Sequence, residues 1–169
     1  MKEHLVKAIL EHGYRHIDTA MIYNNEEIVG EAIQEVMAKG IKREELYITT
    51  KLWHSDKNDV EGAMKTSLRK LKLDYVDLYL VHWMRMDVDW ESENWEIKSP
   101  PLHVVWANME KLVDQKLTKS IGVSNCTIPI MYDMLTYARI RPVVNQIEVH
   151  PYFQQTRVKK FHEKYGIKI

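Results

Sequence analysis

Four side chains that could transfer a proton stand at or just after the ends of three short apolar runs. Asp18 follows the first run and leads to Tyr23, Lys51 closes the second run, and His82 closes the third. Short apolar runs separated by helical patterns are typical of parallel strands buried on both faces. A carboxylate, a phenol, an ammonium and an imidazole at one end of a sheet can shift each other's pKa values. The pattern therefore predicts a proton-transfer site.

This prediction depends mainly on the phenol of Tyr23 and the ammonium of Lys51. A free tyrosine has a pKa of about 10 and is a poor acid or base at neutral pH. A nearby ammonium such as that of Lys51 stabilises the phenolate of Tyr23 and lowers that pKa. Asp18 can keep Lys51 charged and in position, and a neutral His82 can orient a substrate oxygen. Such a group can give a proton to a carbonyl as hydride arrives, or do the reverse.

Each of these residues alone also has an ordinary structural interpretation. Asp18 could cap a helix or turn, and Tyr23 could simply pack in a loop. Lys51 could be solvated at the end of its strand, and His82, beside Trp83, could be a hydrogen-bonded core histidine. Their joint placement at the same end of neighbouring strands favours the functional interpretation.

The elements that must hold these side chains alternate between helix and strand with a period of roughly 30 residues, as in stacked βα units. We expect helices over 2–12, 26–39, 60–71, 102–113, 128–138 and 154–165. We expect strands over 15–20, 47–51, 76–82, 119–124 and 142–147, and the beginning of another at 167–169. Between 84 and 99 the pattern is irregular, which predicts a long loop.

This alternation fits either an open doubly wound sheet or a closed eight-stranded barrel. No Gly-x-Gly-x-x-Gly turn follows any strand, so the dinucleotide fingerprint of the open sheet is absent. Polar residues end nearly every strand, as barrel active sites require, but a closed barrel needs roughly 250 residues. The chain has 169 residues. We therefore predict an α/β fold, a partial (β/α)8 TIM barrel of about five to six βα units. We expect this partial barrel to form one incomplete domain over residues 1–169.

The composition of the chain argues against several classes of binding partner. The formal net charge is +0 and the pI is about 7.1, which argues against a nucleic-acid-binding surface. No apolar run approaches the roughly 20 residues that span a bilayer, so we expect no membrane association. A single cysteine, Cys126, cannot form an internal disulfide and indicates a reducing, cytoplasmic setting. We expect no metal site, because no cluster of Cys and His has the required spacing.

Several long motifs, in order along the chain, resemble the signatures of the aldo-keto reductases. The first is GYRHIDTA at 13–20, followed by Tyr23 and Asn25-Glu26. The later ones are LVHW at 80–83, IGVSN at 121–125, NQIE at 145–148 and HPY at 150–152. The resemblance covers essentially the whole chain.

The resemblance implies a carbonyl reductase that uses NADP(H) and a small-molecule carbonyl substrate. On the matching positions, Tyr23 is the expected proton donor, Lys51 and Asp18 are expected to tune it, and His82 is expected to orient the carbonyl.

The resemblance also implies binding roles. Ser124, Asn125 and Gln146 are expected to bind the nicotinamide carboxamide, since hydroxyl and amide groups offer suitable donors and acceptors. Asp18 is expected near the nicotinamide ribose. An apolar substrate pocket is expected to be lined by Tyr23, Trp53, His82 and Trp83.

The sequence also departs from the family pattern. Met84 stands where most members have proline, and the loop after it is unusually acidic. The family's first barrel strand, its last strands and its phosphate-binding site have no counterpart here. We therefore expect two unpaired sheet edges that a protein partner could cover. The alternative function is that of a catalytically inactive, truncated subunit with a structural role in a larger assembly.

Overall fold

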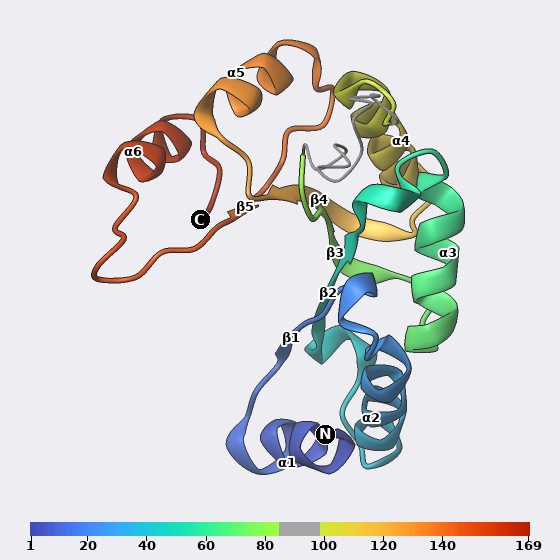
Figure 1. Ribbon diagram of the computed structural model, residues 1–169. Coiled ribbons are helices and arrows are strands. Elements are labelled where there is room, and N and C mark those ends of the chain that lie inside the picture. The colour runs from blue at the N-terminus through green and yellow to red at the C-terminus, as the bar shows by residue number, and fades with distance from the viewer. Residues whose placement is uncertain (85–98) are drawn as a thin grey trace, which may run out of the picture.

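Five parallel strands form one curved sheet, and the helices line its convex side (Figure 1). The computed structural model describes residues 1–84 and 99–169, so most of the predicted acidic loop lies outside the described residues. The strands are β1 (His16–Asp18), β2 (Tyr47–Leu52), β3 (Val76–Val81), β4 (Thr118–Ser124) and β5 (Asn145–Gln146). They pair in chain order, β1-β2-β3-β4-β5. The predicted partial barrel is confirmed: the sheet curls into half of a TIM barrel.

The helices lie where the sequence predicts them, to within a few residues. They are α1 (Lys2–His12), α2 (Glu26–Ala38), α3 (Val60–Leu71), α4 (Leu102–Asp114), α5 (Ile128–Tyr137) and α6 (Thr156–Lys164). Their apolar faces pack on the outer side of the sheet, where Trp106 of α4 is buried and donates from Nε1 to the Ile140 carbonyl at 3.0 Å. Within the described residues, no helix is long and apolar enough to cross a membrane.

Two strands are shorter than predicted. The first covers His16–Asp18 rather than 15–20, and the last covers only Asn145–Gln146 rather than 142–147. Pro142 has no N–H to donate to a ladder, and the predicted stub at 167–169 contributes only a single bridge, between Val144 and Lys168. Strand β5 therefore has a full neighbour on one side only, which limits its length.

An ion-pair cluster ties the strands together at their amino ends, opposite the predicted site. The Asp77 carboxylate accepts from Arg43 Nη2 at 2.8 Å, from the Ile48 N–H at 2.9 Å and from Lys119 Nζ at 2.9 Å. Burial alone would raise the pKa of Asp77, but the bonds from Ile48, Lys119 and Arg43 outweigh it and hold the pKa below its usual value. This cluster stabilises the amino-terminal ends of β2, β3 and β4.

Helices α2 and α3 approach closely at Gly30, so a larger residue at this position should lower stability. A Cβ placed on Gly30 would lie 2.5 Å from the Lys70 carbonyl oxygen and 2.7 Å from the Leu71 carbonyl carbon, both in the backbone of α3. Because backbone cannot rotate away, we expect Gly30→Ala to lower the free energy of unfolding by about 2 to 3 kcal/mol, measured by urea denaturation. Gly40→Ala is the matched control: it has φ +104° but open space around its Cβ, and should cost only about 1 kcal/mol. Equal losses in both variants would mean that the helix contact is unimportant.

Candidate active site

The carboxyl ends of β1, β2 and β3 bring the predicted catalytic side chains to one edge of the sheet. Asp18 ends β1, Lys51 is next to last in β2, and His82 follows β3 directly. The register pairs Lys51 with Leu80, and side chains alternate along a strand, so Lys51, Leu80 and His82 face the same side. The short 3-10 turn Met21–Tyr23 returns Tyr23 over this edge.

The Lys51 ammonium is the centre of the group. It forms an ion pair with Asp18, donates to the Thr19 carbonyl at 3.0 Å and donates to the Tyr23 hydroxyl at 3.4 Å. Lys51 is 0% exposed, so the interpretation of a solvated lysine is wrong. Burying a charge is costly unless it is paired and hydrogen-bonded, and two of the three polar partners named here, Asp18 and Tyr23, belong to the predicted site.

Tyr23 is half-exposed while its ring is held in place. The residue is 48% exposed, yet the Lys51 ammonium lies 4.9 Å from the ring centroid and the His82 ring packs edge-on at 5.6 Å. A phenol that is hydrogen-bonded to a buried ammonium and is also partly exposed to solvent can exchange a proton with a bound molecule.

His82 is buried beside these groups and is neutral at neutral pH. Its ring packs edge-on against Trp53 at 5.2 Å, and its Nδ1 has no hydrogen-bond partner in the described part of the chain. Burial, followed by the nearby Lys51 charge, lowers the pKa of His82 to about 4, although Asp18 acts in the opposite direction. A neutral imidazole carries one N–H, which can hydrogen-bond a substrate oxygen.

This low pKa predicts how stability depends on pH. The folded-state pKa of about 4 lies below the ordinary value of 6.5, so the unfolded chain binds a proton that the folded chain excludes. The contribution of His82 is fully present above about pH 6.5 and is lost as the pH falls toward about 4. Over that window we expect the wild type to lose of the order of 2 kcal/mol more than His82→Gln, measured by urea unfolding at several pH values. Identical pH profiles for the two proteins would contradict the buried, neutral state.

The three predicted carboxamide-binding residues also lie together. Ser124 Oγ donates to the Gln146 carbonyl at 2.8 Å, and Asn125 Nδ2 donates to Ser124 Oγ and to the His82 carbonyl, each at 3.1 Å. No bond among the described residues reaches the side-chain oxygens of Asn125 and Gln146, which are therefore available as acceptors. Two amide acceptors beside a hydroxyl suit a carboxamide NH2 group, so the residues present fit a nicotinamide.

Gln146 connects the predicted carboxamide-binding residues to the predicted catalytic residues. Its Nε2 donates to Asp18 Oδ2 at 3.0 Å, while Asp18 Oδ1 accepts from Lys51. Among residues 1–84 and 99–169, the Asp18 carboxylate accepts from the side chains of Lys51 and Gln146 and from no helix N–H, so the capping interpretation is wrong. The sequence pattern did not predict the contact between Gln146 and Asp18, which are far apart in the chain. It also missed the Thr19 carbonyl as a partner of Lys51, because a main-chain acceptor is independent of residue type.

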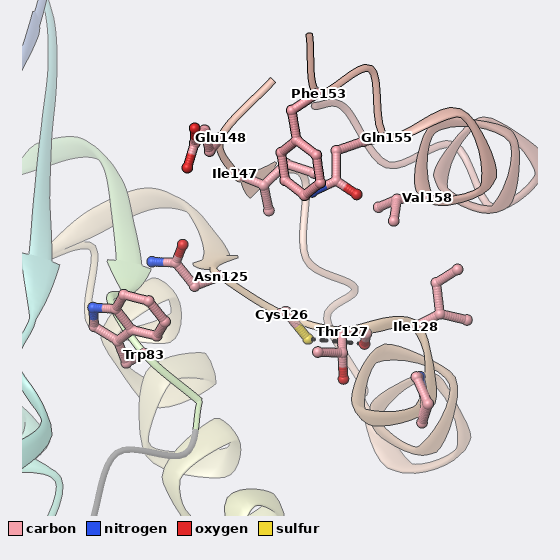
Figure 2. A pocket seen from close by; sticks show the side chains of 11 residues that line it. Trp83, Asn125, Cys126, Thr127, Ile128, Ile147, Glu148, Phe153, Gln155 and Val158 are labelled. Atoms are coloured by element: carbon pink, nitrogen blue, oxygen red, sulfur yellow. Dashed lines mark hydrogen bonds between the residues drawn. The ribbon is translucent and has the colours of Figure 1, made fainter. Parts of the chain in front are cut away.

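The two predicted substrate-pocket tryptophans lie in different surroundings. Trp53 packs against the rings of His82 and His54. Trp83 instead lines a cleft of about 460 Å³, together with Asn125, Cys126 and Phe153 (Figure 2). Each tryptophan therefore borders the candidate site, but the structure gives no contact between them within the described residues.

Comparisons with known proteins show which proteins the chain is similar to. The model of the aldo/keto reductase family matches residues 2–169. Aldose reductase B of Dictyostelium discoideum is 42% identical over 180 residues, which cover 96% of this chain and 57% of that protein. Methylglyoxal reductase DkgA of Yersinia pestis is 43% identical over 164 residues, covering 96% and 53% of the two chains.

A solved structure has a similar fold. The crystal structure of a Bombyx mori aldo-keto reductase in complex with NADP superposes with a TM-score of 0.89 at 38% identity, covering 98% of this chain and 53% of that one. The chain thus spans about half the length of the relatives that it matches.

Proposed function

The chain belongs to the aldo/keto reductase family, and we propose that it reduces small aldehydes and ketones to alcohols with NADPH. The observation that carries this proposal is the buried Lys51 ammonium, held between the Asp18 carboxylate and the Tyr23 hydroxyl. This arrangement prepares a phenol to lose its proton.

In the proposed reaction the carbonyl carbon receives a hydride and its oxygen receives a proton; NADPH, when bound, supplies the hydride. Tyr23 gives its proton to the carbonyl oxygen, and the O–H bond of the phenol breaks as the alcohol O–H forms. Lys51, 3.4 Å from the phenol oxygen, stabilises the phenolate that remains. Asp18 keeps Lys51 charged and in place. Neutral His82 hydrogen-bonds the carbonyl oxygen and so fixes its orientation.

The binding side of the proposal rests on the adjacent residues. Asn125 and Gln146 present free amide oxygens, and Ser124 a hydroxyl, for the nicotinamide carboxamide. Asp18 lies next to Gln146, which supports its predicted place near the ribose. NADPH is favoured because the Bombyx mori relative was crystallised with NADP, and small carbonyl substrates because relatives are named aldose and methylglyoxal reductases.

The alternative of a purely structural subunit has less support. A structural role does not require a fully buried ammonium, and burying one costs free energy unless its partners are arranged around it. Cys126 is buried and free, which is compatible with the cytoplasmic setting that we propose.

The proposal is tested with the chain itself, NADPH and methylglyoxal. We expect loss of the reduced-nicotinamide absorbance, and transfer of deuterium from NADPH deuterated at the transferable position into the alcohol, detected by mass spectrometry. A chain that neither binds NADPH, as judged by quenching of its tryptophan fluorescence, nor forms deuterated alcohol would refute the proposal.

A further inference from the structure

Behind the candidate site, Asn145 of β5 and His162 of α6 are both 0% exposed and hydrogen-bonded to each other. We infer that they form a clamp that positions the Ser124-Asn125 turn for its ligand. They act as positioning residues, because neither touches the reacting groups. The ligand in this inference, a nicotinamide carboxamide, rests on the proposed function; the clamp itself does not.

Asn145 holds both main-chain groups of Cys126, the residue that follows the turn. Its Oδ1 accepts from the Cys126 N–H at 3.2 Å, and its Nδ2 donates to the Cys126 carbonyl at 2.9 Å. An amide side chain carries both a donor and an acceptor, so it can satisfy the N–H and the carbonyl of one residue at once. Cys126 is therefore fixed to the end of β5, and with it the residue before it.

His162 fixes the orientation of that amide. Its Nε2 lies 2.9 Å from Asn145 Nδ2, and its Nδ1 lies 2.8 Å from the Val158 carbonyl, one turn earlier in α6. A carbonyl can only accept, so the Nδ1 atom carries the hydrogen and the Nε2 atom accepts the second N–H of Asn145. The amide cannot flip, because a flipped amide would oppose its N–H groups to the Cys126 N–H.

The backbone of the turn is also bonded directly to β5. Asn125 has φ +53°, in the left-handed region that, apart from glycine, single asparagine and aspartate residues adopt most readily. Its N–H donates to the Gln146 carbonyl at 3.0 Å, on the same strand as Asn145. Figure 2 shows Asn125, Cys126 and Thr127 following one another along one side of the cleft, so a shift of Cys126 would move the Asn125 amide.

A histidine at position 162 suits the hydrogen bond to Asn145 better than an apolar residue would. His162 is the only buried residue in α6, a helix that is described throughout and is mostly polar apart from Val158 and Phe161. An apolar side chain would pack there without needing partners, but it would leave one Asn145 N–H buried and unsatisfied. The histidine therefore serves Asn145, and through it the turn.

Two amide substitutions of different length test the clamp. In His162→Gln the longer side chain can still place an acceptor near the position of Nε2, whereas in His162→Asn the amide reaches only as far as Nδ1. We expect His162→Asn to speed hydrogen exchange of the Cys126 amide, followed by NMR, by on the order of 10-fold to 100-fold. We expect it to raise the Kd for NADPH by about 10-fold, and His162→Gln to restore both values.

The outcomes separate the clamp from the proposed function. Unchanged Cys126 exchange in His162→Asn, or failure of His162→Gln to restore it, overturns the clamp. Faster exchange with an unchanged Kd overturns its positioning role. If the wild type binds no NADPH, the proposed function fails, and the exchange comparison still decides the clamp. Asn145→Ser, which removes the clamp from the strand side, must show the same faster exchange, and serves in place of His162→Asn if that variant does not fold.

Discussion

Replacing Tyr23 with phenylalanine is expected to lower the kcat of NADPH-dependent aldehyde reduction by about 10²-fold to 10⁴-fold. The change removes only the hydroxyl that we propose gives its proton to the carbonyl. The ring contacts with His82 and Lys51 remain, and the side chain is half-exposed. The free energy of unfolding should therefore stay within about 0.5 kcal/mol of the wild-type value, and the Kd for NADPH should change little.

Tyr14→Phe provides the matched control for this prediction. Tyr14 is 64% exposed and lies outside the candidate site, so the same chemical change there should leave kcat as it is. Steady-state kinetics and urea unfolding, measured on the wild type, Tyr23→Phe and Tyr14→Phe, test the prediction. Full activity in Tyr23→Phe would show that another group supplies the proton.

The chemistry-bearing strands could be predicted from sequence because their patterns are local and unambiguous. Strand β3 is a continuous apolar run with every residue buried, which is the pattern of a central parallel strand. Once the strands are parallel, their carboxyl ends must lie at one edge, which brings Asp18, Lys51 and His82 together. The convergence of these residues was therefore a consequence of topology rather than of any single motif.

The remaining features depend on contacts between segments far apart in the chain. The sequence predicted a six-residue strand over 142–147, but its length depends on how much of the neighbouring chain pairs with it. The role of His162 was also missed, because a histidine in a lysine-rich helix is ordinarily solvated. Only the packing of α6 over the end of β5 turns it toward Asn145.

The second large effect is expected from Lys51→Met. Methionine is close to lysine in length but carries no charge, so the phenolate of Tyr23 would form without a neighbouring cation. We expect kcat to fall by about 10²-fold to 10³-fold, as when one preorganised donor to a developing anion is removed. Unfolding free energy should fall by about 1 to 2 kcal/mol, less than for a fully buried pair, because Asp18 is one-third exposed and keeps its bond from Gln146.

Lys119→Met is the control for the loss of one lysine from an ion pair. Lys119 pairs with Asp77 at the opposite end of the sheet, so its removal should leave kcat close to the wild-type value. Lys119→Met losing as much activity as Lys51→Met would mean that general destabilisation explains both results.

The double variant Tyr23→Phe/Lys51→Met distinguishes the proposed role of Lys51 from a separate one. If Lys51 acts by stabilising the Tyr23 phenolate, it has nothing to stabilise once the hydroxyl is gone. The double variant should then be no slower than the slower single variant, since residues that act as a unit are strongly non-additive. If the two losses multiply instead, Lys51 acts on the cofactor or substrate directly, and the 3.4 Å contact with the phenol is not the reason for its burial.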